Sequence, residues 1–245
     1  MATNGNVSMR IVLATLALLV SIAGGSAEAR AFPAFPVPVS PSQVLAVLLT
    51  PHEAFARPMP GARRLAVVQA RRTLTGEPTV LPVLRMSTGA DGSRWLQVRL
   101  PGRPNGHSGW IRKKGTRASV TVWHILVATS RRLVIVYESG RQVRTADAIV
   151  GKPSTPTPHG EFFVEEAVEL PATDPGAPFA LALSARSEVL QTFDGGPGQV
   201  AVHGLAHLAG RPGTAVSHGC VRLTADMMRW LVSRIGPGVP VTITN

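Results

Sequence analysis

The sequence predicts a mainly β protein, with a twisted β-sandwich that carries one helix near its C-terminal end and a small β-barrel before it. The 245 residues include 24 glycines and 21 prolines, and turn residues at this frequency favour short strands over long helices. From Arg94 to Leu100 apolar and polar residues alternate, which is typical of a half-buried strand. A helical pattern is clear near the C-terminus, and few others are visible. These features favour β architecture with many turns.

The N-terminus has the pattern of an export signal. Within residues 1–29, Arg10 precedes the apolar run Ile11–Ala23, and Ala27-Glu28-Ala29 follows it. A basic start, a short apolar run and an A-x-A site are the parts of a cleavable signal peptide. The run has 13 residues, whereas a membrane span needs about 20. We expect Sec-type export with cleavage near Ala29; an uncleaved N-terminal anchor is the alternative.

A proline-rich stretch and a small β module are expected next. Residues 30–42 contain AFPAFPVPVSPS, a composition typical of an extended spacer. In the module, residues 43–117, the strand 94–100 is followed by a turn at 101–106 and by a second strand that starts with Gly109-Trp110-Ile111. This WLxVxLP…GWI pattern resembles bacterial SH3-type domains, which are small β-barrels. The alternative is an irregular extension that packs on the following domain.

Positive charge is concentrated in this module. Residues 57–117 contain 13 lysines and arginines but only two acids, Glu77 and Asp91, a net charge of +11. The whole chain also has a net charge of +11, so the remainder is neutral. A basic module beside a neutral domain suggests attraction to an anionic polymer or membrane surface. Nucleic acid is the usual partner of such a charge, but export argues against it. A merely solubilising surface is the alternative.

Residues 118–245 are expected to form the β-sandwich. The first three strands should form a meander, with turns near residues 129–131 and 139–140, where turn residues gather. The apolar runs predict strands at residues 119–128, 133–138, 142–150, 161–164, 179–183, 189–193 and 199–202. A closing strand is expected at residues 238–243. Loops at residues 155–158 and 165–177 are expected to border a cleft.

The predicted helix spans residues 225–235. Thr224 can cap its N-terminus, Asp226 suits the positive end of the helix dipole, and Gly236 follows as a stop signal. Four apolar residues recur at helical spacing and are interpreted as core contacts: Met227, Met228, Leu231 and Ile235.

Cys220 is the candidate nucleophile. It is the only cysteine of the chain, so it cannot form an intramolecular disulfide, and a free thiol in an exported protein suggests reactivity. A neighbouring imidazole could remove its proton, as in Cys–His nucleophilic catalysis. A buried, inert cysteine is one alternative. A metal site is another, with His203, His207, His218 and Cys220 as ligands, but His218-x-Cys220 is unusually tight spacing for it.

A family resemblance starts from these residues. The chain reads His203-Gly204, then thirteen residues later Ser217-His218-Gly219-Cys220-Val221-Arg222-Leu223. This pattern resembles the signature of the YkuD-type L,D-transpeptidase catalytic domain of bacterial cell-wall enzymes. Thr157-Pro158-His159-Gly160-Glu161-Phe162 is similar to a second family segment, and residues 238–243 are similar to its closing strand. The resemblance extends from near Val120 to Thr244 and implies the L,D-transpeptidase type of β-sandwich.

The resemblance implies a role for each matched residue. Cys220 would be the nucleophile, His203 the general base and then acid, and Gly204 the residue whose carbonyl orients the imidazole. Backbone N–H groups of His218, Gly219 and Cys220 would form the oxyanion hole. Ser217 and Arg222 would bind substrate, although Arg222 could instead make a structural salt bridge. No metal or other cofactor is expected.

The other histidines leave one alternative open. Alternate residues of an extended segment share a face, so His218 could also reach Cys220 and act as the base. The family pattern favours His203, which makes His218 a structural hydrogen-bonding group. His207 is expected to border the cleft, and His124 lies in an apolar strand.

The expected function is that of an exported L,D-transpeptidase in the cell envelope, either the periplasm or the cell-wall space. It would cross-link or remodel peptidoglycan stem peptides through a thioester on Cys220. One alternative is an L,D-carboxypeptidase or amide hydrolase that uses water on the same acyl-enzyme. The other is a non-catalytic cell-wall-binding protein.

Overall fold

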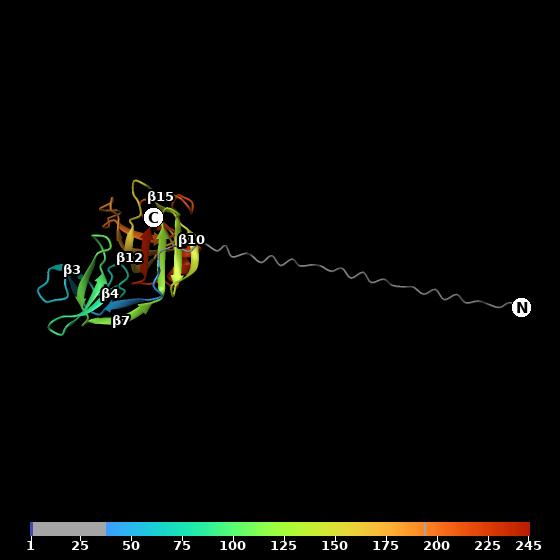
Figure 1. The fold of residues 1–245 in the computed structure, drawn as a ribbon. Coiled ribbons are helices and arrows are strands. Elements are labelled where there is room, and N and C mark those ends of the chain that lie inside the picture. Colours follow the sequence, from blue (N-terminus) through green and yellow to red (C-terminus); the bar gives the residue numbers. More distant parts are fainter. Residues whose placement is uncertain (2–37, 194) are drawn as a thin grey trace. The chain divides into compact units, whose positions relative to one another are not determined.

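The structure is a computed structural model that describes residue 1, residues 38–193 and residues 195–245. Apart from Met1, the predicted signal peptide lies outside the described residues, as does most of the predicted spacer. Strands dominate the described part, which contains two large β-sheets and a single α-helix (Figure 1). The mainly β class predicted from the sequence is therefore confirmed.

The N-terminal sheet has seven strands in the order β3-β2-β6-β5-β4-β1-β7, and every neighbouring pair is antiparallel. Its strands are β1 (Gln43–Leu48), β2 (His52–Phe55), β3 (Arg64–Val68), β4 (Val80–Thr88), β5 (Arg94–Arg99), β6 (Ser108–Arg112) and β7 (Thr116–Thr121). The alternating stretch that begins at Arg94 is β5, as predicted. The SH3-like character of residues 43–117 and the division into modules stay predictions.

The C-terminal sheet has eight strands in the order β10-β9-β8-β17-β12-β13-β14-β16. They are β8 (Trp123–Ala128), β9 (Leu133–Glu138), β10 (Arg141–Asp147), β12 (Gly160–Glu169), β13 (Phe179–Arg186), β14 (Gln199–His203), β16 (Val221–Arg222) and β17 (Pro240–Thr244). A separate parallel pair joins β11 (Val150–Gly151) to β15 (Ala215–Ser217). β14 and β16 are also parallel, with His203 opposite Arg222. This pairing brings two distant sequence segments together at one edge of the sheet.

The core of the C-terminal half lies between its sheet and the helix α1 (Ala225–Val232). Met227, Met228 and Leu231 face this core, as their helical spacing predicts. Full burial of side chains of this size stabilises the fold by roughly 1.5–3 kcal/mol each. The Thr224 hydroxyl accepts a hydrogen bond from the N–H of Met227 at 3.3 Å and so caps the helix. The helix ends at Val232, three residues before the predicted end.

Several predicted strands differ from the observed ones. The predicted strand 119–128 is divided into β7 and β8, because β7 pairs with β1 while β8 pairs with β9 and β17. Residues 189–193 do not form one of the strands of the described chain, so this prediction is wrong. The Ser187 hydroxyl accepts hydrogen bonds from the N–H groups of Val189 (3.3 Å) and Leu190 (3.0 Å). This turn engages backbone groups that a sheet ladder would require.

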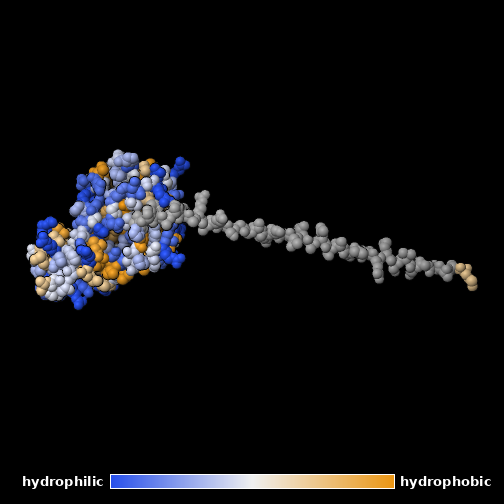
Figure 2. Space-filling view, viewed as in Figure 1, coloured by the Kyte–Doolittle hydropathy of each residue, from blue (hydrophilic) through white to orange (hydrophobic). Residues whose placement is uncertain are grey.

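The surface of the described part is mainly polar on the face that Figure 2 shows, with smaller apolar patches between hydrophilic side chains. Exposed apolar side chains include Met86, Val120 and Phe193. Among the described residues, none of the helical structure is both long and apolar enough to cross a lipid bilayer.

Candidate active site

Cys220 lies in the tight connection between β15 and β16, where it is half-buried. The Ser217 hydroxyl donates a hydrogen bond to the carbonyl of Cys220 (2.6 Å) and accepts one from the N–H of Gly219 (3.1 Å). Gly219 has φ +121°, a conformation that side chains with a Cβ rarely adopt. Glycine at this position therefore permits the turn that presents Cys220.

The imidazole of His203 is held by the residue that follows it. His203 Nδ1 lies 2.8 Å from the carbonyl oxygen of Gly204. A carbonyl can only accept a hydrogen bond, so Nδ1 carries the proton and Nε2 of the neutral ring keeps its lone pair. His203 ends β14 and Cys220 directly precedes β16, the strand that pairs with it. The two side chains line the same cavity.

Gly176 lies close against this imidazole, and no sequence pattern indicated a role for it. A Cβ on Gly176 would lie 2.6 Å from His203 Nδ1, and its φ of +89° also requires glycine. The N–H of Gly204 donates to the carbonyl of Gly176 at 2.7 Å. A Cβ on Gly204 would clash with the Ala177 carbonyl oxygen, so both glycines permit a close backbone approach. A loop was predicted here, but nothing in the sequence pairs it with His203.

Burial keeps both members of the pair uncharged. The pKa of His203 is lowered to about 4, chiefly by burial; the hydrogen bond to Gly204 opposes this shift and the charge of Arg222 adds to it. Burial also raises the pKa of the Cys220 thiol, opposed by a hydrogen bond with the backbone of Ala201 and by the charge of Arg222. The resting pair at neutral pH is therefore a thiol beside a neutral imidazole, not a thiolate–imidazolium pair.

Arg222 supplies a buried positive charge beside this pair. Its side chain lines the cavity, and Nη1 donates to the Ala209 carbonyl at 2.9 Å. Its Nε is buried without a hydrogen-bond partner. In the described part of the chain, no carboxylate lies within 4.0 Å of the guanidinium, so the structural salt bridge considered from the sequence is not observed. The charge is left facing the cavity.

The cavity has a volume of about 680 Å³. His218 lines it together with His203, Cys220 and Arg222. The ring of Phe193 lies 5.8 Å from the ring of His218, tilted by 31°. The structure thus brings both candidate bases into one cavity with the thiol. Of the two, His203 has the ring orientation fixed by a backbone carbonyl.

Three other predicted residues are placed differently from the expectation. Ser217 is fully buried. Its hydroxyl forms hydrogen bonds within residues 217–220, which we call the nucleophile loop, so it supports that loop instead of facing substrate. The N–H of Gly219 points to Ser217 Oγ and not into the cavity. His207 Nε2 donates to the Ala172 carbonyl at 3.0 Å, and His207 is not among the residues that line the cavity.

The four residues considered as metal ligands do not assemble into a ligand cluster. Within residues 38–193 and 195–245, no three His, Cys, Asp or Glu side chains meet in an arrangement that could hold a metal ion. Two threonines that precede β12 bind backbone groups of the paired strands β11 and β15, next to Cys220 in the chain. Thr157 Oγ1 accepts from the N–H of Gly151 (2.9 Å), and Thr155 Oγ1 donates to the Ser217 carbonyl (3.2 Å).

The sequence around this site is similar to that of known proteins. The family model YkuD, described as the L,D-transpeptidase catalytic domain, matches residues 123–243. L,D-transpeptidase 1 of Mycobacterium tuberculosis is 25% identical in an alignment of 222 residues that covers 77% of this chain and 87% of that protein. A YkuD relative from Bacillus licheniformis is 31% identical over 125 residues, covering 50% of this chain and 66% of that protein. The solved structure of the LD transpeptidase LdtMt1 in complex with imipenem is 22% identical, covers 67% of this chain and 90% of that chain, and has a TM-score of 0.41.

The matched residues contain the whole β14–β16 edge, with His203, Cys220 and Arg222. Residues 123–243 are thus identified as an L,D-transpeptidase catalytic domain of the YkuD family, and the protein is an enzyme of that class.

Proposed function

We propose that this protein is an exported enzyme that exchanges peptide bonds in peptidoglycan stem peptides through a thioester on Cys220. The observation that carries the proposal is the position of the single thiol in one cavity with an imidazole whose Nδ1 is held by Gly204. This arrangement leaves Nε2 free to accept the proton of the thiol. The Gly204 carbonyl replaces the carboxylate that orients histidine in a Ser-His-Asp triad.

In the first step, His203 Nε2 takes the proton of Cys220 while Sγ attacks the carbonyl carbon that follows an L-residue of a tetrapeptide stem. The carbonyl oxygen becomes an oxyanion, to which we assign the backbone N–H groups of His218 and Cys220. Gly219 is left out of this assignment because its N–H already donates to Ser217. The intermediate then breaks its C–N bond, and the His203 imidazolium gives its proton to the departing D-alanine amine.

Arg222 has two uses in this step. Its positive charge favours the thiolate as the proton leaves Cys220. A guanidinium without a carboxylate partner can also bind the carboxylate of the departing D-residue. We propose that Arg222 binds that carboxylate, because the side chain lines the cavity and its Nε lacks a partner.

In the second step, the side-chain amine of a neighbouring stem attacks the thioester carbonyl. His203 removes the proton of the attacking amine and returns it to the sulfur as the C–S bond breaks. An amide cross-link forms and the thiol is restored. Water in place of the amine would give carboxypeptidase activity on the same acyl-enzyme.

The proposal is tested by incubating the purified chain without residues 1–29 with a disaccharide tetrapeptide that carries a diamino acid. Mass spectrometry should detect a cross-linked dimer and free D-alanine, and Cys220→Ala should give neither. Release of D-alanine with tripeptide monomer alone would assign the hydrolytic activity instead. Intact substrate with the folded wild-type protein would contradict both.

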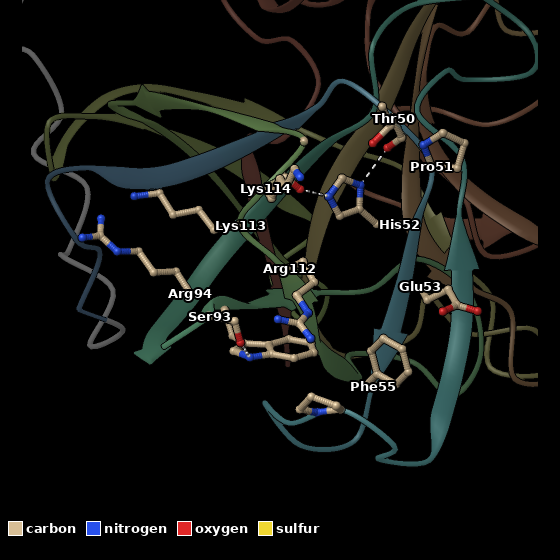
Figure 3. A pocket seen from close by; sticks show the side chains of 13 residues that line it. Thr50, Pro51, His52, Glu53, Phe55, Ser93, Arg94, Arg112, Lys113 and Lys114 are labelled. Carbon is tan, nitrogen blue, oxygen red and sulfur yellow. Dashed lines mark hydrogen bonds between the residues drawn. The ribbon is translucent and has the colours of Figure 1, made fainter. Parts of the chain in front are cut away.

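We also propose that the N-terminal sheet binds an anionic polymer of the envelope, bearing phosphate or carboxylate groups. A pocket of about 1060 Å³ lies on this sheet, and four basic side chains line it: Arg94, Arg112, Lys113 and Lys114 (Figure 3). In the described chain, Arg94, Lys113 and Lys114 have no carboxylate within 4.0 Å.

The floor of this pocket supports the same interpretation. Arg112 stacks on the ring of Trp95, with 4.2 Å between the guanidinium carbon and the ring centroid, and its one carboxylate contact, with Asp91, is 3.5 Å long and exposed. Exposed ion pairs of this kind contribute little, so the charge remains available. A row of unpaired cations beside apolar surface suits a sugar polymer with anionic groups.

A further inference from the structure

The turn between β5 and β6 of the N-terminal sheet reaches the C-terminal half of the chain. Arg103, in this turn, donates hydrogen bonds to three backbone carbonyls: from Nη2 to Ser187 (2.7 Å) and Leu190 (3.3 Å), and from Nη1 to Pro197 (2.9 Å). One guanidinium fork therefore ties together both ends of the loop that follows β13.

Neighbouring residues of the same turn fix its position. Asn105 pairs with the backbone of Arg186 in both directions, at 2.8 Å each. Gly102 donates its N–H to the Ser184 carbonyl at 3.2 Å. Arg186 is itself buried and paired with Glu165, which also contacts Arg72 of the N-terminal half. The turn is thus anchored on a rigid strand, β13, and its position is fixed independently of the loop it holds.

The loop that Arg103 holds forms part of the lining of the catalytic cavity. Ser187, Leu190 and Phe193 all line it, as does Gly198. We call residues 187–193 the wall segment. Phe193 packs against His218 in the nucleophile loop. The wall segment therefore lies between Arg103 and the residues beside Cys220, which connects the N-terminal sheet to the substrate cavity.

The wall segment forms its other bonds within its own loop. It pairs with no strand of the described sheets. The Ser187 hydroxyl accepts bonds from the N–H groups of Val189 and Leu190, the N–H of Ser187 donates to the Gly198 carbonyl at 2.8 Å, and the backbones of Phe193 and Gly196 pair at 2.9 and 3.0 Å. Phe193 is 49% exposed. Segments with few buried contacts open at low free-energy cost, whereas hydrogen bonds from a charged donor are among the stronger ones. Arg103 thus supplies the charged hydrogen bonds that tie this loop to the turn between β5 and β6.

We propose that Arg103 is a positioning residue for substrate binding. It fixes the position of the wall segment and thereby the shape of the cavity beside Cys220 in which the stem peptide to be cleaved would bind. The part that concerns substrate rests on the function proposed above; the part that concerns the wall does not. Because Arg103 touches neither Cys220 nor His203, its loss should weaken binding of a long stem peptide and leave the chemistry of the thiol unchanged.

The experiment compares Arg103→Ala and Arg103→Lys with Arg85→Ala, which removes the same charge from an exposed position on β4. Hydrogen exchange followed by mass spectrometry should show amides of residues 187–193 exchanging about tenfold faster in Arg103→Ala. KM for the tetrapeptide muropeptide should rise by a similar factor while kcat changes little. Arg103→Lys should restore part of both effects, and Arg85→Ala should match wild type in both.

Alkylation of Cys220 by iodoacetamide should proceed at the wild-type rate in all three variants. Wild-type exchange of the wall segment in Arg103→Ala would overturn the proposal. So would an equal loss of kcat and of thermal stability without a change in KM, because that result describes a fold defect. If wild type itself turns over no muropeptide, the proposed function fails, and the exchange comparison still decides the role of Arg103.

Discussion

The Nδ1 atom of His203 lies 2.8 Å from the carbonyl oxygen of Gly204, the next residue in the chain. This contact fixes which ring nitrogen carries the proton. It therefore separates His203 from His218, which lines the same cavity and packs against Phe193. The difference between the two histidines can be measured.

His203→Ala should slow acylation of Cys220 by on the order of 10²-fold or more, because the proton of the thiol loses its acceptor. His218→Ala should lower the melting temperature as well as the rate, since it removes the ring that packs on Phe193. The rate is followed by intact-protein mass spectrometry with imipenem as the acylating compound, and folding by circular dichroism. Near-wild-type acylation in folded His203→Ala would assign the base to His218.

Gly176→Ala should displace the His203 ring, because the added Cβ would lie 2.6 Å from Nδ1 and the backbone φ of +89° disfavours alanine. We expect a loss of acylation rate close to that of His203→Ala, with the fold retained. Gly196→Ala is the matched control: its nearest neighbour to an added Cβ, the Phe193 carbonyl oxygen, is 3.5 Å away and its φ is not in the left-handed region. Unchanged acylation in Gly176→Ala would mean that the loop does not hold the imidazole.

The raised pKa of Cys220 and the lowered pKa of His203 predict the pH dependence of the free enzyme. Burial favours the neutral form of both groups, so His203 stays unprotonated, and able to act as a base, down to about pH 4. Alkylation of Cys220 by iodoacetamide should rise steadily with pH to above 9. A rate plateau below pH 7 would instead indicate a thiolate–imidazolium pair and contradict the assignment.

The elements that could be predicted from sequence are those with local signals. The turn residues and alternation predict β5 and the meander strand β9, whose bounds, Leu133–Glu138, agree with the prediction. The motif around Cys220 predicts that the thiol and His203 act together, and the parallel β14–β16 pairing brings both to one cavity. The strand predicted at residues 189–193 is not observed, although Val189–Phe193 has the apolar content of a strand.

What the sequence could not predict depends on contacts between distant residues. Arg103 and Ser187 are 84 positions apart, and no local pattern distinguishes Arg103 from the other arginines of the basic N-terminal half. Gly176 also depends on a distant residue: a side chain at position 176 would collide with the His203 ring, so glycine is required there by that ring as well as by its own turn. The burial of Ser217 likewise depends on the hydrogen bonds that close the nucleophile loop.

Binding to the envelope through the pocket on the N-terminal sheet should depend on salt. Release of counterions from an anionic polymer should lower affinity roughly tenfold or more between about 50 and 200 mM salt. Sedimentation with sacculi that retain their anionic polymers measures this binding. Reversing Arg112, Lys113 and Lys114 to glutamate should weaken sedimentation at fixed salt, while turnover of a soluble muropeptide scarcely changes.

Reversal of Arg141, Lys152 and Arg211, in the neutral C-terminal half, is the control with the same change in charge. Equal effects of the two triple variants, or sedimentation that does not depend on salt, would leave the basic charge as a solubility feature. Binding to anionic phospholipid vesicles but not to sacculi would assign the pocket to the membrane surface.

The central claim is that Cys220 forms the acyl-enzyme, and the most direct test is the intact mass of the protein after incubation with imipenem. Wild type should gain the mass of one bound imipenem, or of its fragment, and peptide mapping should locate it on Cys220. Cys220→Ala should remain unmodified while keeping the melting temperature of wild type within a few degrees, since the substitution removes one half-buried sulfur. A covalent adduct that persists in folded Cys220→Ala would contradict the assignment.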